Sequence, residues 1–253
     1  MTATRAYLAR IRQHLTLALA GLFLCIATPS LAEMFGPISG QVHGTGAKAL
    51  VIVLHGDSGP DYITSFAADL ARRNPQSTVI QMARPGYSIA GRRSKGSNSG
   101  SRDHYTKQNN NLLAQGISAA SQAYPHNRLV VVAHSGGAAQ TGTLLGTVPG
   151  LIDIAVMVSG PFDIPRWRAS RGTPWPKSQS PIRYLDQIPR QTKIIAVTGQ
   201  QDSNTQPGLA RDYVAKAQAR GLNATFTAIP NAGHSFRSLK EPVLAIATRE
   251  IQS

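Results

Sequence analysis

Ser135, Asp202 and His234 are residues of the types that can act together in nucleophilic catalysis, and each lies within a few residues of the end of an apolar run. A serine hydroxyl is a weak nucleophile until a base removes its proton, and an imidazole can be that base. A carboxylate beside the imidazole fixes its tautomer and stabilises its protonated form. These residues would therefore supply a nucleophile, a base and an orienting acid in a fold that brings them together.

The strongest local signal is the sequence Ala-His-Ser-Gly-Gly at 133–137, which contains Ser135. It lies between an apolar run typical of a buried strand and a small-residue segment typical of a helix. A serine on so sharp a strand-to-helix turn needs small residues two positions before and two positions after it, which is the physical reason for the pattern G-x-S-x-G. Ala133 replaces the first glycine and is still small. The turn also places Ser135 at a helix N-terminus, where backbone N–H groups favour negative charge.

Apolar runs alternate with helical segments along most of the chain, and this alternation has to position the three residues. Continuous apolar runs predict strands buried on both faces. The pattern as a whole predicts an α/β fold with a mostly parallel sheet and helices on both faces. The expected strands are 49–54, 78–83, 129–133, 152–158, 194–197 and an outer strand at 224–229; the expected helices are 61–73, 106–124, 136–147, 208–220 and 239–251.

Two segments interrupt this alternation. Residues 84–105 are rich in Gly, Ser, Arg and Lys and predict a long, mobile, basic loop, since loops of this length in compact domains are usually functional or disordered. Residues 164–191 hold five prolines and both tryptophans and predict a small irregular insertion.

The residues around Ser135 resemble those of the α/β-hydrolase superfamily, and the resemblance extends over essentially the whole chain after residue 32. It implies a catalytic triad in the chain order Ser135, Asp202, His234. In that family the acid usually follows the penultimate strand and the histidine follows the last strand. Asp163 is the alternative acid, because some members place the acid after the strand that corresponds to 152–158. The stretch 180–186 is similar to the one before the acid in prolyl-oligopeptidase-like and small esterase-like hydrolases.

The same resemblance implies an oxyanion-hole loop in the sequence His-Gly-Asp-Ser-Gly at 55–59. The hole would combine the N–H of Gly136 with that of Asp57 or of Ser58. A carboxylate is unfavourable beside a developing oxyanion. The side chain of Asp57 must therefore point away from the oxyanion, or Ser58 is the donor.

Tyr87 and His134 are candidates for contact with substrate. Tyr87 would donate to the oxyanion or line an acyl pocket, or alternatively pack in a rigid turn. His134 lies beside the nucleophile and would shape the turn. The histidines at 43, 104 and 126 show no metal-ligand spacing, so the sequence predicts neither a metal site nor a cofactor.

Residues 1–32 have the layout of a secretory signal peptide: a start with three arginines, an apolar run at 15–26, and a small-x-small ending that predicts cleavage after Ala32. The alternative is a membrane anchor, but the apolar run is shorter than the ~20 residues that span a bilayer. Cleavage would leave an exported, periplasmic or secreted domain of residues 33–253. It would also remove Cys25, the only cysteine, and leave no thiol for catalysis or disulfides.

The formal net charge is +14, and removal of the leader would leave +11. Such a charge would attract anionic envelope surfaces, acidic substrates or nucleic acid, although a solvated basic surface is the more common explanation. No zinc-finger spacing or RNA-binding signature is present, so nucleic acid is not an expected partner. No pattern in the sequence indicates an oligomeric state.

These observations predict hydrolysis of a carboxylic ester or related acyl bond, in a small-molecule or peptide substrate, through an acyl-serine intermediate. A peptidase or an acyltransferase with the same triad is the nearest alternative, because these differ only in the leaving group or the acceptor. A non-catalytic binding protein on the same fold is the alternative of another class.

Overall fold

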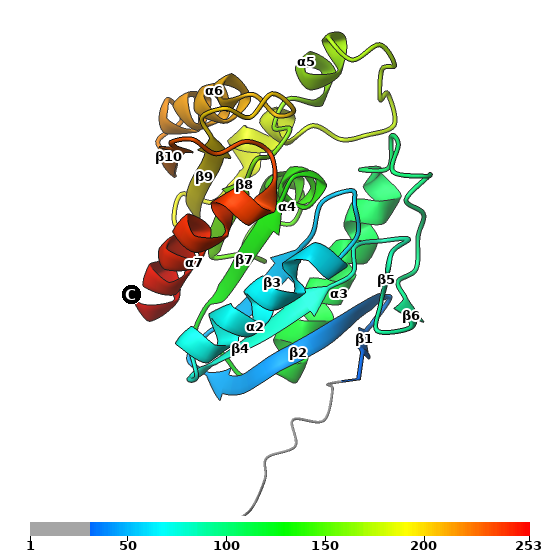
Figure 1. Ribbon diagram of the computed structural model, residues 1–253, viewed down its shortest axis with the longest axis vertical. Helices are drawn as coiled ribbons and strands as arrows, with labels where there is room; N and C mark the ends of the chain where they lie inside the picture. Colours follow the sequence, from blue (N-terminus) through cyan, green and yellow to red (C-terminus); the bar gives the residue numbers. More distant parts are fainter. Residues whose placement is uncertain (1–30) are drawn as a thin grey trace, which may run out of the picture. The chain divides into compact units, whose positions relative to one another are not determined.

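The apolar runs form a central eight-stranded sheet in the computed structural model, which describes residues 31–253 (Figure 1). The spatial order of the strands is β1-β2-β4-β3-β7-β8-β9-β10. Pairing is antiparallel between β1 and β2 and between β2 and β4, and parallel across the rest of the sheet. The strands are β1 (Glu33–Phe35), β2 (Ile38–Ala47), β3 (Leu50–Leu54), β4 (Ser77–Met82), β7 (Leu129–His134), β8 (Ile154–Val158), β9 (Lys193–Gly199) and β10 (Asn223–Ile229).

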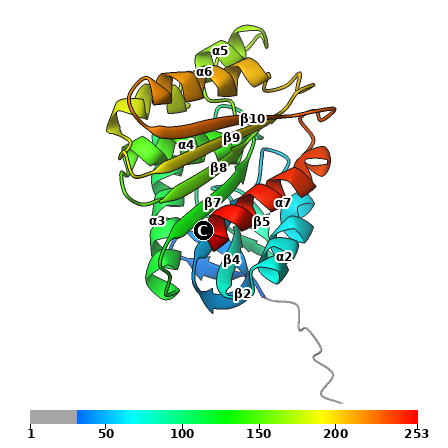
Figure 2. The same ribbon diagram turned by 90° about the vertical axis from the view of Figure 1, so that its left-hand side faces the viewer.

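Helices cover both faces of this sheet, as the sequence predicted (Figure 2). One layer holds α2 (Thr64–Arg73), preceded by the short 3-10 helix η1 (Asp61–Ile63), and α7 (Phe236–Gln252). The other holds α3 (Lys107–Ala123), α4 (Gly136–Thr147) and α6 (Pro207–Gln218). The mostly parallel α/β architecture is therefore confirmed.

Alternate residues of the central strands supply the two cores. In β3, Leu50, Ile52 and Leu54 pack toward α3 and α4, whereas Val51 and Val53 pack toward α2 and α7. Successive side chains of a strand point to opposite faces, so a strand buried on both faces needs an unbroken apolar run. This requirement explains why continuous apolar runs in the sequence predicted the central strands.

The segment 84–105 differs from the expected mobile loop. It contains a small antiparallel hairpin, β5 (Ser88–Ile89) and β6 (Arg92–Arg93), and both of its ends are buried in the domain. Arg84 and Tyr105 are fully buried, whereas most residues from 90 to 102, including the four other cations of the segment, are exposed. The expectation was wrong about these ends because their polar side chains bind partners that are distant in the sequence.

The insertion at 164–191 forms the short helix α5 (Ile164–Ala169) and the 3-10 helix η2 (Pro181–Gln187) around an irregular stretch. Trp167 and Trp175 pack edge to face, with ring centres 5.2 Å apart. The predicted signal peptide lies outside the described residues except for its last two positions. Within residues 31–253, no helix combines the length and the apolar character needed to cross a bilayer.

The parallel strands all end at one edge of the sheet, and this edge collects the predicted site. Asp57 follows β3, Ser135 follows β7, Asp202 follows β9 and His234 follows β10. Ligand sites of open α/β sheets lie beyond the carboxyl ends of the strands for this topological reason.

Candidate active site

Ser135 occupies a strained turn between β7 and α4, with φ 53° and ψ −116°. A non-glycine residue rarely adopts this region, and such strain is typical of functional positions. The neighbouring backbone is close: a Cβ on Gly137 would lie 2.6 Å from the carbonyl oxygen of His55. The loop after β3 approaches the serine turn so closely that only a small residue fits at position 137.

The structure brings Ser135, His234 and Asp202 together in a hydrogen-bonded row. The Nε2 atom of His234 lies 3.1 Å from Oγ of Ser135, and its Nδ1 lies 2.9 Å from Oδ2 of Asp202. If Nδ1 carries the proton and donates it to the carboxylate, Nε2 is free to accept the serine hydroxyl proton. This is the arrangement that a serine nucleophile requires.

Asp202 is almost fully buried and its carboxylate is saturated with donors. Oδ1 accepts hydrogen bonds from the backbone N–H groups of Asn204 and Thr205, at 2.9 and 2.8 Å. The Thr205 hydroxyl lies 2.9 Å from Oδ2. Burial by itself would raise the pKa of Asp202, but the hydrogen bond from His234 and the donors of Thr205 outweigh it and lower the pKa. The carboxylate is therefore held ionised.

Asp163, the alternative acid, is not brought to the histidine. It is the N-cap of α5, and its side chain accepts a hydrogen bond from the backbone N–H of Arg166. This is an ordinary helix-capping role.

His134 takes part in a second row of hydrogen bonds beneath the histidine loop. Its Nδ1 lies 2.7 Å from the hydroxyl of Tyr62, and its Nε2 lies 3.0 Å from the backbone carbonyl of His234. The Tyr62 hydroxyl in turn accepts from the N–H of Gly56 at 2.5 Å. Burial, followed by the proximity of His234, lowers the pKa of His134 to about 3, so the ring stays neutral. His134 thus supports the backbone of the histidine loop and also lines the pocket.

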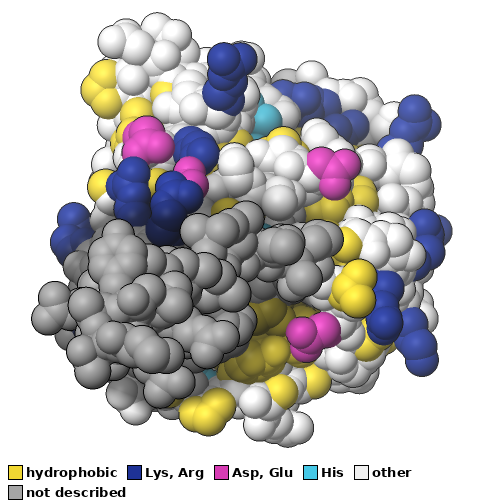
Figure 3. Space-filling model, turned by 60° about the horizontal axis from the view of Figure 1, so that its bottom comes forward, with side chains coloured by type: hydrophobic (Ala, Val, Ile, Leu, Met, Phe, Trp, Pro, Cys, Tyr) yellow, Lys and Arg dark blue, Asp and Glu magenta, His cyan; other side chains and the backbone are white. Residues whose placement is uncertain are grey.

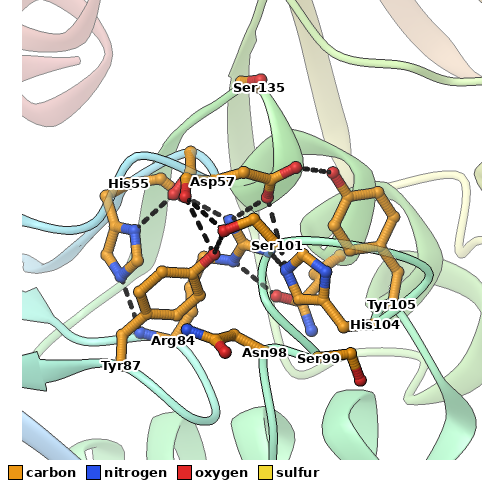
Figure 4. Close-up of polar contacts among 12 residues, drawn as sticks. His55, Asp57, Arg84, Tyr87, Asn98, Ser99, Ser101, His104, Tyr105 and Ser135 are labelled. Atoms are coloured by element: carbon orange, nitrogen blue, oxygen red, sulfur yellow. Dashed lines mark hydrogen bonds and ion pairs between the residues drawn. The ribbon is translucent and has the colours of Figure 1, made fainter.

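The loop after β3 lies against the serine turn, with Asp57 at its centre (Figure 4). A Cβ on Gly56 would approach Cβ of Ser135 to 2.9 Å. No hydrogen-bond partner is found among the described residues for the backbone N–H of Asp57 or of Ser58. Gly136 is the first residue of α4, and the N–H groups of a helical first turn have no partner within the helix. All three predicted oxyanion donors are therefore in the same neighbourhood.

The side chain of Asp57 is held by buried groups. Its Oδ1 accepts from Nη1 of Arg84 at 3.0 Å, and its Oδ2 accepts from the hydroxyl of Tyr105 at 2.7 Å. Burial would raise the pKa of this carboxyl, but the hydrogen bond from His104 and the charge of Arg84 lower it well below its usual range. This pairing of the carboxylate was not foreseen from the sequence, and the choice between Asp57 and Ser58 as the donor stays a prediction.

Tyr87 is buried, and its hydroxyl donates to the backbone carbonyl of Asp57 at 3.0 Å. It does not line the pocket beside Ser135. The expectation that it contacts substrate or oxyanion is therefore not supported; the alternative of a tyrosine packed in a turn describes it better.

A pocket of about 650 Å³ opens beside the row of three residues. Ser135, His134 and His234 line it together with the oxyanion-loop residues and with the first turn of α7. Its aromatic walls are Tyr62 and Phe236, and its charged rim carries Arg237 and Lys240. The volume is within the range of small-molecule sites. Within residues 31–253, no cluster of His, Cys, Asp and Glu is placed to hold a metal ion.

A family model described as the prolyl oligopeptidase family matches residues 102–250, more than half of the chain, and this stretch contains Ser135, Asp202 and His234. The chain belongs to the prolyl oligopeptidase family. Membership confirms that the protein is an α/β-hydrolase enzyme, as the sequence resemblance implied. A search of curated protein sequences finds no match.

Solved structures with low sequence identity share the fold of this family member. An esterase from Pyrococcus furiosus aligns with a TM-score of 0.64 at 16% identity, over 85% of each chain. A protein from Thermus thermophilus aligns with a TM-score of 0.62 at 15% identity, over 89% of this chain and 100% of the other. An acylaminoacyl peptidase from Pyrococcus horikoshii gives 0.65 at 12% identity, over 88% of this chain and 40% of its own.

Several residues of the site escaped the sequence analysis, chiefly Tyr62, Arg84, Tyr105 and Thr205. Their roles depend mainly on contacts with residues distant in the chain, such as that of Tyr62 with His134 and that of Tyr105 with Asp57, so no spacing pattern marks them. The sequence Arg-Pro-Gly-Tyr at 84–87 stood out as a turn, but only the fold shows that its arginine faces Asp57.

Proposed function

We propose that the protein hydrolyses carboxylic esters through an acyl-serine intermediate, with Ser135 as nucleophile, His234 as general base and Asp202 as the orienting acid. The observation that carries this proposal is the continuous row of hydrogen bonds from Ser135 Oγ through the His234 ring to Asp202. Membership in a family of serine hydrolases supports it.

In the first step, Oγ of Ser135 attacks the ester carbonyl carbon while Nε2 of His234 takes the hydroxyl proton. The carbonyl oxygen gains a negative charge, and the imidazolium is stabilised by Asp202. Collapse of the tetrahedral intermediate expels the alcohol, which receives the proton from His234. A water molecule then repeats the sequence on the acyl-serine and releases the acid.

The developing oxyanion would be stabilised by the N–H groups of Gly136 and Asp57. The free N–H groups and the neutralised Asp57 carboxylate support this assignment. One donor of this kind contributes ~100- to 1,000-fold to the rate.

Peptide hydrolysis is the second candidate, because the family model that matches is named for oligopeptidases. A free α-ammonium group is bound most strongly by a carboxylate, because charge-assisted hydrogen bonds are roughly twice as strong as neutral ones. Among residues 31–253, Asp57 is the only carboxylate that lines the pocket, and it is already bound by Arg84 and Tyr105. The lining therefore favours esters over peptides with a free amino terminus.

The test is steady-state hydrolysis of p-nitrophenyl esters of increasing acyl length, measured beside aminoacyl p-nitroanilides. We expect Ser135-dependent ester hydrolysis with a preference for one range of acyl length, and little release from the anilides. Turnover of the anilides alone, lost in Ser135→Ala, would replace the esterase proposal with a peptidase.

A further inference from the structure

Three successive peptide groups of the loop after β3 are each fixed by a side chain. The N–H of Gly56 donates to Tyr62, and the carbonyl of Gly56 accepts from Nδ1 of His55 at 2.6 Å. The carbonyl of Asp57 accepts from the hydroxyls of Tyr87, at 3.0 Å, and Ser101, at 2.9 Å. The loop lies outside the helices and strands, and the one backbone hydrogen bond within it runs from the N–H of Gly59 to the carbonyl of Gly56 at 3.4 Å, so side-chain contacts are its main restraints.

These contacts also aim the free N–H groups. In a trans peptide the C=O and the N–H point to opposite sides. The carbonyl of Gly56, held toward His55, therefore sets the direction of the Asp57 N–H. The carbonyl of Asp57, held toward Tyr87 and Ser101, sets the direction of the Ser58 N–H. Figure 4 shows these side chains gathered around Asp57 below Ser135.

The Asp57 carboxylate lies beside the predicted oxyanion site, and its negative charge is paired with Arg84. A Cβ on Gly136 would lie 2.3 Å from Oδ1 of Asp57, 2.7 Å from Nη1 of Arg84 and 2.7 Å from the Tyr105 hydroxyl. The carboxylate and its partners thus pack directly against the residue that supplies the other oxyanion donor. An unpaired negative charge there would oppose the oxyanion, and Arg84, which is fully buried, neutralises it.

We propose that Tyr87 and Tyr105 are positioning residues of the oxyanion loop. Tyr87 fixes the peptide group between Asp57 and Ser58, which restrains the Asp57 backbone and aims the Ser58 N–H, and Tyr105 with Arg84 holds the Asp57 carboxylate as a paired charge. The inference rests on the proposed function. Tyr87, Ser101 and Tyr105 all belong to the segment 84–105. The segment would therefore contribute to catalysis by positioning the oxyanion loop, without contacting the substrate.

The experiment compares Tyr87→Phe, Tyr105→Phe and the double variant with the wild type. Each change removes one hydroxyl and keeps the ring. Tyr213→Phe is the matched control, because Tyr213 is fully buried, lies outside the site, and its hydroxyl has no hydrogen-bond partner among the described residues. The readouts are the rate of Ser135 labelling by a fluorophosphonate, kcat and KM for p-nitrophenyl acetate, and Tm.

We expect the labelling rate and kcat to fall about 3- to 10-fold in each single variant and further in the double variant, because a misaimed donor loses part of its contribution. KM should stay within about twofold, since the ground-state ester needs no oxyanion hole. Tyr213→Phe should match the wild type in labelling and kcat. Ser101→Ala, at a half-buried position, should reproduce the effect of Tyr87→Phe if a tyrosine variant loses stability.

Wild-type labelling rates and kcat in Tyr87→Phe, Tyr105→Phe and Ser101→Ala would overturn the inference and leave the proposed function intact. A fall in Tm without a fall in kcat would also overturn it, because the role would then be structural. Absence of Ser135 labelling in the folded wild type would instead overturn the proposed function, and the inference with it.

Discussion

Among single residues, the two aspartates that the sequence left as alternatives for the acid have different contacts in the fold. Oδ2 of Asp202 lies 2.9 Å from Nδ1 of His234, whereas Asp163 is the N-cap of α5. The chain order and strand-end positions of the triad were readable from the sequence, because both follow from the topology. The choice between the two acids could not be made from the sequence, because it depends on how the segment between β8 and β9 folds.

Asp202→Asn should lower kcat for a p-nitrophenyl ester by about 10⁴-fold, because the amide favours the wrong imidazole tautomer. Asp163→Asn should leave kcat within about twofold, since asparagine is also a good N-cap. Steady-state kinetics of the two purified variants decide the matter. The assignment is wrong if activity survives in Asp202→Asn and is lost in Asp163→Asn.

His134 allows a prediction about pH and stability. Its pKa is lowered from 6.5 to about 3, chiefly by burial, so between these values the unfolded chain binds a proton that the folded chain does not. Stability should therefore fall as pH falls through this window, by up to ~1.4 kcal/mol per pH unit for this one group. In urea titrations between pH 7 and 4, His134→Gln should show a flatter loss of unfolding free energy than the wild type. Equal slopes would show that His134 is not buried as a neutral ring.

At the scale of elements, the packing of α4 against the loop after β3 explains why the helix begins with glycine. Gly136→Ala would push a methyl group into Asp57, Arg84 and Tyr105. We expect a loss of kcat of at least about tenfold from displacement of the oxyanion loop, together with a lower Tm. Enzyme assays and thermal unfolding of the purified variant measure both effects.

Gly208→Ala is the matched control for that change. Gly208 lies in the first turn of α6, and the nearest atom to a new Cβ is 3.8 Å away. Alanine should there be neutral or slightly stabilising, because it has the higher helix propensity. If both alanine variants behave alike, close approach at Gly136 does not explain its role.

The strands and helices could be predicted from the sequence because burial on both faces imposes continuous apolar runs, and helices impose a period. The segment 84–105 could not. Arg84 and Tyr105 look like loop residues by composition, yet they are fully buried because Asp57, some thirty to fifty positions earlier, pairs with them. Local composition does not contain such long-range pairing.

For the whole molecule, the excess of basic over acidic residues is the feature that bears on the substrate. On the face seen in Figure 3, Lys and Arg side chains lie around the margin with few acidic side chains among them. The net charge of +14 predicts attraction of anionic substrates. Arg237 also favours an anionic substrate, because it lines the pocket and has no hydrogen-bond or ion-pair partner within residues 31–253.

We therefore expect kcat/KM for an anionic ester, mono-p-nitrophenyl succinate, to fall several-fold as salt rises from about 0.02 to 0.3 M. The neutral p-nitrophenyl butyrate should change less than about twofold over that range. Arg237→Gln should weaken the salt dependence for the anionic ester. Parallel salt curves for the two esters would show that the charge does not act on substrate.

Labelling with a fluorophosphonate, followed by mass-spectrometric mapping of the modified peptide, shows whether Ser135 is the nucleophile activated by His234. We expect one adduct per chain, on Ser135, with labelling abolished in Ser135→Ala and strongly slowed in His234→Ala. Folded wild-type protein that forms no adduct, or an adduct on another residue that persists in Ser135→Ala, would contradict this assignment.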